Sequence, residues 1–159
     1  VAFSEEGGEK PLAVRLLDER LAVCRLGGEV RAFHDLCIHR GAPLSLGWVE
    51  GDNLVCAYHG WAYSNDGALQ AVPNLQDAYY SELDTNKWGL VPVAQLDSYK
   101  GLIFGTFDSE AQPLCEYLGD LAWYLDVFVD RCEGGKEKLA EAGYQLESLY
   151  DREDMMNES

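Results

Sequence analysis

Short apolar runs, separated by polar or glycine-containing turns, fill most of the first 107 residues. Gly27-Gly28 and Lys100-Gly101 are typical hairpin turns, and Asp18-Glu19 is a weaker turn signal. Pro92 places its run at a sheet edge or bulge, because proline lacks a backbone N–H. Runs with the length of strands or short hairpins lie at 12–17, 21–26, 30–34, 48–55, 90–96 and 102–107. The pattern therefore predicts a mainly β protein built from small antiparallel sheets.

The period of the apolar residues changes after residue 113. From Leu114 to Phe128 they recur at helical spacing, although Gly119 weakens the pattern. A second helix is expected at 136–150, after Gly134-Gly135. Before these helices, residues 73–88 are polar and rich in turn formers, and we expect them to form a surface excursion. The predicted organisation is one domain over residues 1–130 and a helical, charged tail over 131–159.

The composition of the chain is that of a globular protein. The chain has 159 residues, and 47% of them are hydrophobic, which suffices for a domain with a core. No apolar run approaches the ~20 residues that a membrane helix needs. No basic segment precedes an apolar one at the start, so we expect no export signal and a cytoplasmic location.

The charge is strongly negative and uneven. Residues 1–60 carry 9 acidic and 6 basic side chains (net −3), and residues 61–159 carry 19 acidic and 6 basic ones (net −13), which together give −16. Such a surface repels phosphate backbones, so nucleic acid is not an expected partner. It either keeps the protein soluble or attracts a partner with a basic face.

Five cysteines bear on the cellular compartment. Cys24, Cys115 and Cys132 are odd in number and have no paired spacing. This argues against a disulfide scaffold and favours a reducing compartment. Cys24 lies in an apolar run and is expected to be a buried small hydrophobic residue.

The other two cysteines belong to the strongest chemical signal in the chain. Cys37-Ile38-His39 is followed sixteen residues later by Cys56-Ala57-Tyr58-His59, which gives the pattern C-x-H-x16-C-x-x-H. Each half offers a thiolate and an imidazole on a short loop, and two neighbouring hairpin loops can bring the halves together. Two sulfurs and two nitrogens suit tetrahedral zinc or a [2Fe–2S] cluster with two Cys on one iron and two His on the other.

The sequence around the four residues resembles one family. Residues 37–45 and 56–61 are similar to the two cluster-binding loops of Rieske domains in the α subunits of ring-hydroxylating oxygenases. Positions that would be cysteine in respiratory-complex Rieske proteins hold other residues here. Further similarity lies in Arg31-Ala32-Phe33, Gly60-Trp61, Val72-Pro73, residues 99–103, residues 117–120 and Trp123-Tyr124, within roughly residues 12–130.

The resemblance implies a Rieske-type fold, with a two-loop subdomain formed by residues 36–47 and 56–61. It implies a Rieske [2Fe–2S] cluster bound by Cys37, His39, Cys56 and His59. The function would be one-electron transfer towards a non-haem iron site, as the Rieske part of an oxidoreductase that degrades aromatic hydrocarbons. A reductase or ferredoxin would donate electrons, and an oxygenase catalytic domain or neighbouring subunit would receive them.

The sequence lacks what oxygen activation needs. A mononuclear iron in these oxygenases is held by two His and a carboxylate. The chain has three histidines, and two belong to the motif. We therefore expect no complete catalytic site within these 159 residues. Two other functions stay open: a stand-alone Rieske-type ferredoxin between a reductase and an oxygenase, and a zinc-stabilised binding module.

Three aromatic residues and one histidine flank the motif. Tyr58, Trp61 and Tyr63 are expected to pack in the core, and the alternative is a shield that keeps water from the cluster. His34 ends a predicted strand just before the first loop. It is expected to be a packed or surface residue and not a ligand.

Overall fold

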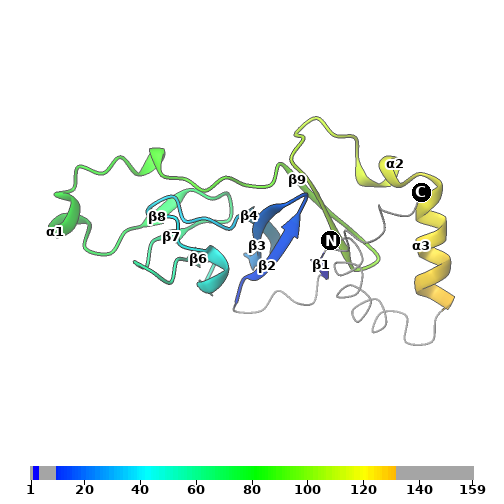
Figure 1. Ribbon diagram of the computed structural model, residues 1–159, viewed down its shortest axis with the longest axis horizontal. Coiled ribbons are helices and arrows are strands. Elements are labelled where there is room, and N and C mark those ends of the chain that lie inside the picture. The colour runs from blue at the N-terminus through cyan, green and yellow to red at the C-terminus, as the bar shows by residue number, and fades with distance from the viewer. Residues whose placement is uncertain (1, 4–9, 132–159) are drawn as a thin grey trace, which may run out of the picture.

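Three small antiparallel sheets follow one another along an elongated molecule (Figure 1). The computed structural model describes residues 2–3 and 10–131. One sheet has the order β2 (Leu12–Leu16), β3 (Glu19–Leu26) and β4 (Glu29–His34). The second has the order β5 (Trp48–Glu50), β6 (Asn53–Val55), β7 (Ala62–Tyr63) and β8 (Leu69–Ala71). The third has the order β1 (Ala2–Phe3), β10 (Leu102–Thr106) and β9 (Gln95–Tyr99).

Few helices accompany the sheets. The segment before β5 contains the 3-10 turn η1 (Leu44–Leu46), and α1 (Leu75–Tyr79) and η2 (Thr85–Lys87) follow β8. Helices α2 (Leu114–Leu118) and α3 (Asp120–Arg131) follow β10. The predicted mainly β fold of small antiparallel sheets is confirmed. None of the helices in the described part of the chain is long and apolar enough to cross a membrane.

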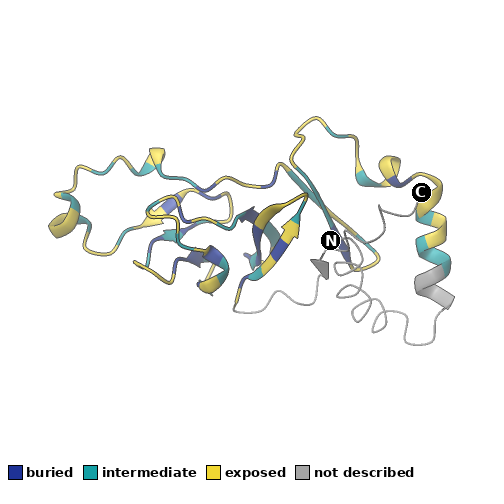
Figure 2. Cartoon of the chain, viewed as in Figure 1, coloured by how far each residue is buried: buried dark blue, intermediate teal, exposed yellow. Residues whose placement is uncertain are grey.

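Strand β3 divides the core in two, because successive side chains of a strand point to opposite faces. Ala22, Cys24 and Leu26 face the core that lies towards β6 and β7. Leu21 and Val23 face a second core, which includes Val93 of the segment before β9 and Ile103 of β10. Figure 2 shows these buried strands in the middle of the molecule, with exposed residues in α1, α2 and the connecting loops. Cys24 is buried as expected, and its burial raises the pKa of the thiol to about 12.

The turn between β2 and β3 lies one residue earlier than expected. Leu17 and Asp18 both have positive φ angles, 49° and 68°, and β3 begins at Glu19. The side chain of Leu17 is consequently 85% exposed and belongs to no strand. The Gly27-Gly28 turn is confirmed, with φ angles of 59° and 84° that glycine adopts without strain.

The strand predicted at 90–96 is wrong over most of its length, because β9 begins at Gln95. The preceding residues instead form a single bridge with β4, between Phe33 and Pro92. The His34 N–H donates to the Val91 carbonyl at 2.9 Å, and the Val93 N–H donates to the Ala32 carbonyl at 2.9 Å. Proline supplies no donor between these two bonds, and its place at the edge of β4 agrees with the expectation.

The single helix predicted at 114–128 is interrupted. Gly119 has φ 46° and ψ −127°, a conformation outside the helical region, and it separates α2 from α3. The predicted apolar stripe is also largely unburied: Tyr117, Leu121 and Tyr124 are 72%, 53% and 63% exposed. The helix predicted at 136–150, Cys132 and nearly all of the predicted tail lie outside the described residues.

Candidate metal centre

Two loops of matching backbone geometry carry the motif, one after β4 and one between β6 and β7. In the first, the Cys37 N–H donates to the Ala42 carbonyl at 2.8 Å, and the Gly41 N–H donates to the Cys37 carbonyl at 2.8 Å. In the second, the Cys56 N–H donates to the Trp61 carbonyl at 2.9 Å, and the Gly60 N–H donates to the Cys56 carbonyl at 2.9 Å. Gly41 and Gly60 share a φ angle of 70°, which favours glycine. The two cysteines therefore occupy equivalent positions in two similar turns.

The two thiols lie together in the interior. Cys37 is 2% exposed and Cys56 is 1% exposed, and the thiols are close enough to hydrogen-bond. The Tyr63 hydroxyl lies 3.1 Å from the sulfur of Cys37. Burial raises the pKa of Cys37, whereas hydrogen bonds from the Tyr63 hydroxyl and from the backbone N–H of His39 act to lower it. A metal cation would reverse the effect of burial, because a coordinating thiol is deprotonated outright.

The two imidazoles also form a pair. The ring centroids of His39 and His59 lie 4.7 Å apart, and their planes meet at 65°. His39 is partly buried and stacks on Trp61, with centroids 4.2 Å apart and planes at 4°. Burial lowers the pKa of His39, and the neighbouring His59 lowers it further. Both effects favour the neutral imidazole, which is the form that binds a metal.

The donor set is divided into a sulfur pair and a nitrogen pair. Within the described residues, no three His, Cys, Asp or Glu side chains gather closely enough to hold one metal ion. A tetrahedral zinc site would require such a group. A Rieske cluster needs two Cys on one iron and two His on the other, so its ligands lie in separated pairs. The sulfur pair Cys37–Cys56 and the nitrogen pair His39–His59 match the two pairs of ligands that a Rieske cluster needs.

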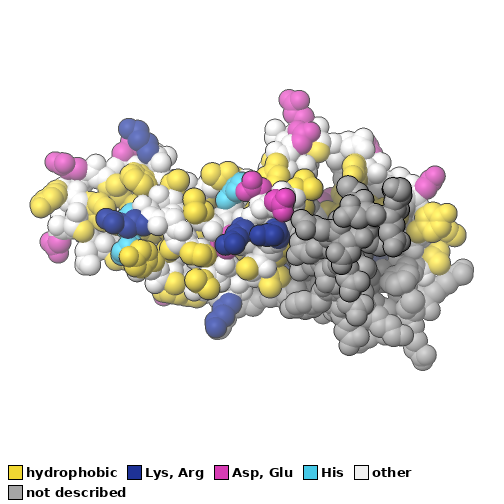
Figure 3. All heavy atoms as spheres, in the orientation of Figure 1, with side chains coloured by type: hydrophobic (Ala, Val, Ile, Leu, Met, Phe, Trp, Pro, Cys, Tyr) yellow, Lys and Arg dark blue, Asp and Glu magenta, His cyan; other side chains and the backbone are white. Residues whose placement is uncertain are grey.

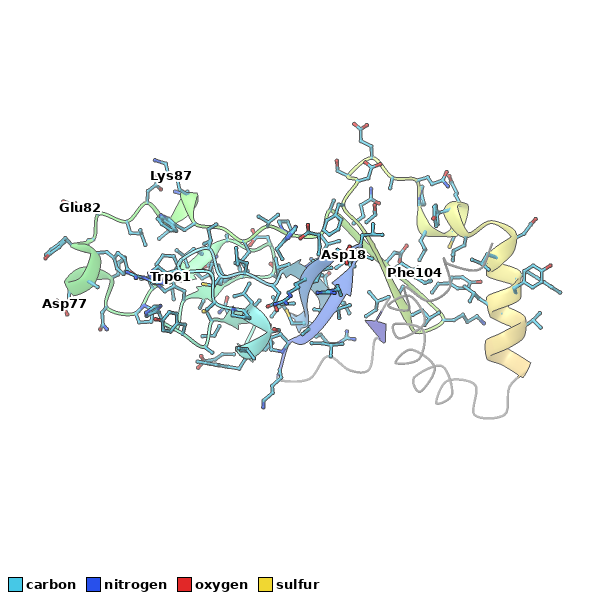
Figure 4. The ribbon with its side chains drawn as sticks, in the orientation of Figure 1. Asp18, Trp61, Asp77, Glu82, Lys87 and Phe104 are labelled. Atoms are coloured by element: carbon cyan, nitrogen blue, oxygen red, sulfur yellow. The ribbon has the colours of Figure 1, made fainter. Side chains whose placement is uncertain are left out.

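The aromatic neighbours follow the expectation in part. Trp61 and Tyr63 are 1% and 0% exposed and belong to the core, as expected. Tyr58 is 64% exposed, so its predicted core packing is wrong. Its ring instead lies over His59, with centroids 3.9 Å apart. Figure 4 shows Trp61 between α1, at one end of the molecule, and the strands in its middle.

His34 lies at the end of β4, as expected for a residue that is not a ligand. Its ring is about one third exposed and lies 3.5 Å from the Glu19 carboxylate and 5.5 Å, between ring centroids, from Phe107. The described structure records no contact between His34 and the four motif residues.

Two features near the site have little or no signal in the sequence. Residues 73–88 are not only a surface excursion, because Tyr79 and Trp88 pack against the core and the Tyr79 hydroxyl lies 3.0 Å from Nε2 of His39. The carboxylate of Asp35 accepts hydrogen bonds from the backbone N–H and the hydroxyl of Ser45, both at 2.7 Å. The aromatic residues in an otherwise polar segment were the only sequence signal for the contacts of Tyr79 and Trp88, and the Asp35–Ser45 contact had none.

The Asp35 contacts predict a measurable stability effect. Asp35→Ala leaves two donors of the first loop without their partner, so we expect the free energy of unfolding to fall by about 1–3 kcal/mol. Urea unfolding of the metal-free chain measures the change. Ser45→Ala removes only the hydroxyl bond and should cost less, about 1 kcal/mol. Equal stability of Asp35→Ala and the wild-type chain would contradict the assignment of this contact.

The comparison with known proteins agrees with this geometry. Residues 2–99 match the family model of the Rieske [2Fe-2S] domain. The chain is 42% identical over 130 residues to the large oxygenase component of the naphthalene 1,2-dioxygenase system of Pseudomonas putida. It is 37% identical over 125 residues to the biphenyl 2,3-dioxygenase subunit alpha of Rhodococcus jostii. These matches cover 80% and 77% of the chain but 28% and 26% of the relatives, so the chain spans little more than a quarter of their length.

Solved structures support the same assignment. The crystal structure of naphthalene 1,2-dioxygenase from a Rhodococcus species bound to indole superposes with a TM-score of 0.67 at 39% identity. The match covers 84% of this chain and 31% of that one. Family model, sequence and fold thus agree: the chain belongs to the Rieske [2Fe-2S] domain family, in the form found in the large components of ring-hydroxylating oxygenases.

Proposed function

We propose that this chain transfers one electron at a time through a Rieske [2Fe–2S] cluster, towards a non-haem iron site outside its 159 residues. The thiolates of Cys37 and Cys56 would hold one iron, and the imidazoles of His39 and His59 would hold the other. The bound cluster supplies the chemistry by accepting and releasing one electron. The observation that carries the proposal is that two equivalent loops bring the thiols of Cys37 and Cys56 together and the imidazoles of His39 and His59 together.

The surroundings of the two pairs suit electron transfer. The thiols are buried, which keeps water from one side of the centre, and the pKa shift of His39 favours the neutral ligand form. His59 is exposed, and Ile38 and Tyr58 beside it are 40% and 64% exposed. A redox partner would reach the centre most closely at this surface, at the loop tips.

The proposed electron donor is a reductase or ferredoxin, and the proposed acceptor is an oxygenase catalytic domain or neighbouring subunit. The net charge of −16 would raise the encounter rate with a basic partner. On the face shown in Figure 3, acidic side chains are spread over the length of the molecule and do not form one patch. On this face the charge would act as a general attraction, and the apolar loop tips would give the contact its specificity.

Iron and acid-labile sulfide analysis tests the cofactor, with about two of each expected per chain. The dithionite-reduced protein should give the rhombic EPR signal of a mixed-valence Rieske centre. Stopped-flow mixing with a reduced dioxygenase-system ferredoxin should then show cluster reduction that slows as salt is added. A colourless protein with one zinc per chain would contradict the proposal.

The Tyr63 hydroxyl predicts an effect on the reduction potential. Hydrogen bonds to cluster sulfurs stabilise the more negative reduced state, so Tyr63→Phe should lower the midpoint. A hydrogen bond of about 0.5–1.5 kcal/mol corresponds to roughly 20–60 mV for one electron. Spectroelectrochemical titration measures the shift. Tyr58→Phe removes an exposed hydroxyl that makes no hydrogen bond among the described residues, and it should leave the midpoint unchanged. A midpoint unaffected by Tyr63→Phe would show that the bond to Cys37 does not reach the cluster.

A further inference from the structure

Two adjacent tyrosines at the end of helix α1, its last residue Tyr79 and the following Tyr80, lie in opposite environments. Asn74 before the helix and Tyr80 and Ser81 after it have φ angles of 56°, 53° and 56°, which are left-handed conformations at non-glycine residues. These residues turn the chain sharply at both ends of α1. Tyr79 is consequently partly buried and packed on the core, whereas Tyr80 is 80% exposed. In Figure 4, Asp77 and Glu82 lie at the outer end of this segment, away from Trp61.

Tyr79 contacts the ring of His39 through both its hydroxyl and its edge. The hydroxyl lies 3.0 Å from Nε2 of His39. The aromatic ring is edge-on to His39 at 6.2 Å and to Trp61 at 5.9 Å between centroids. Trp61 stacks flat on His39, and Trp88 lies edge-on to Trp61 at 5.6 Å. The imidazole of His39 is thus held against Trp61 on one face and by the hydroxyl at Nε2.

The other histidine of the pair is held differently. His59 is exposed, and in the described part of the chain no side chain forms a hydrogen bond with it. Its ring contacts are with His39 and Tyr58. The two imidazoles are therefore inequivalent, and the difference comes from a contact between residues 40 positions apart.

We propose that Tyr79 is a positioning residue, whose hydroxyl accepts a hydrogen bond from Nε2–H of His39 and so directs the Nδ1 lone pair of that ring to the cluster. This inference rests on the proposed role of His39 as a ligand. A neutral imidazole has one N–H and one lone pair, so fixing the proton on Nε2 selects Nδ1 as the metal-binding atom. Ligand histidines generally donate their other N–H to such a partner, and loss of the partner costs 10–100-fold in metal affinity.

Tyr79→Phe tests the hydroxyl alone, because phenylalanine lacks the hydroxyl but keeps the edge-on packing of the ring. In the cluster-loaded full chain, we expect cluster absorbance to be lost about tenfold faster in the presence of an iron chelator. Pulsed EPR of the reduced protein should show a changed nitrogen hyperfine coupling for one histidine and an unchanged coupling for the other. Tyr80→Phe is the matched control and should alter neither measurement.

Circular dichroism of the cluster-loaded variant separates loss of fold from loss of positioning. The inference would be overturned if the Tyr79→Phe chain bleached at the wild-type rate and kept the wild-type hyperfine couplings of both histidines. A wild-type chain that takes up no [2Fe–2S] cluster would instead overturn the proposed function.

Discussion

Cys56→Ser is expected to leave the protein without its cluster, with iron falling from about two atoms per chain to nearly none. A serine hydroxyl is a far weaker acid than a thiol, and its oxygen is a harder ligand than sulfur, so it is a poor substitute for a thiolate in an iron–sulfur cluster. The site offers no substitute, because Cys56 is 1% exposed and lies beside Cys37. Iron content and the visible absorbance of the purified protein measure the loss.

Cys24→Ser is the matched control for this prediction. Cys24 is also 1% exposed and belongs to the same core, but it lies on β3 and outside the two loops. Its replacement should lower stability while leaving the iron content per folded chain unchanged.

A pair of histidine variants gives the same comparison: His59→Ala should bleach the protein, and His34→Ala should not. The reverse pattern in either pair would show that the ligand assignment is wrong.

Gly47→Ala is expected to destabilise the fold severely, by about 3 kcal/mol or more. A Cβ atom at Gly47 would lie 2.0 Å from the carbonyl oxygen of Val55 and 3.0 Å from that of Leu44. Both obstacles are backbone atoms, so no flexible side chain can move aside, and overpacking of this kind is costly. Val55 directly precedes Cys56, and relieving the clash would displace the second loop. Urea unfolding of the metal-free chain and iron content together measure both consequences.

Gly51→Ala provides the contrast for Gly47. Gly51 has a φ angle of 59° in the turn between β5 and β6, and nothing lies within 4 Å of an added Cβ. Its replacement should cost only the strain of a left-handed alanine, about 1–2 kcal/mol. Gly47 has a φ angle of −82°, which any residue adopts. If Gly51→Ala proved the more damaging of the two, conformational strain and not close packing would govern this hairpin.

The sequence by itself determined the features that depend on neighbouring residues. The turns at Gly27-Gly28 and Lys100-Gly101, the mainly β class and the paired C-x-H and C-x-x-H loops are local patterns. Glycine reveals such turns because it adopts positive φ without a Cβ penalty. The family resemblance rests on the same short stretches, and the match to the Rieske domain model confirms it.

The tertiary structure alone decided the contacts between distant segments. The Tyr79 hydroxyl at His39, the backbone that excludes a side chain at Gly47, and the exposure of Leu121 and Tyr124 have no local signature. Apolar periodicity reports which residues share a face but not whether another element covers that face. Which atoms meet depends on how the sheets and the segment after β8 pack together, and that packing determines how one histidine of the pair is held while the other stays exposed.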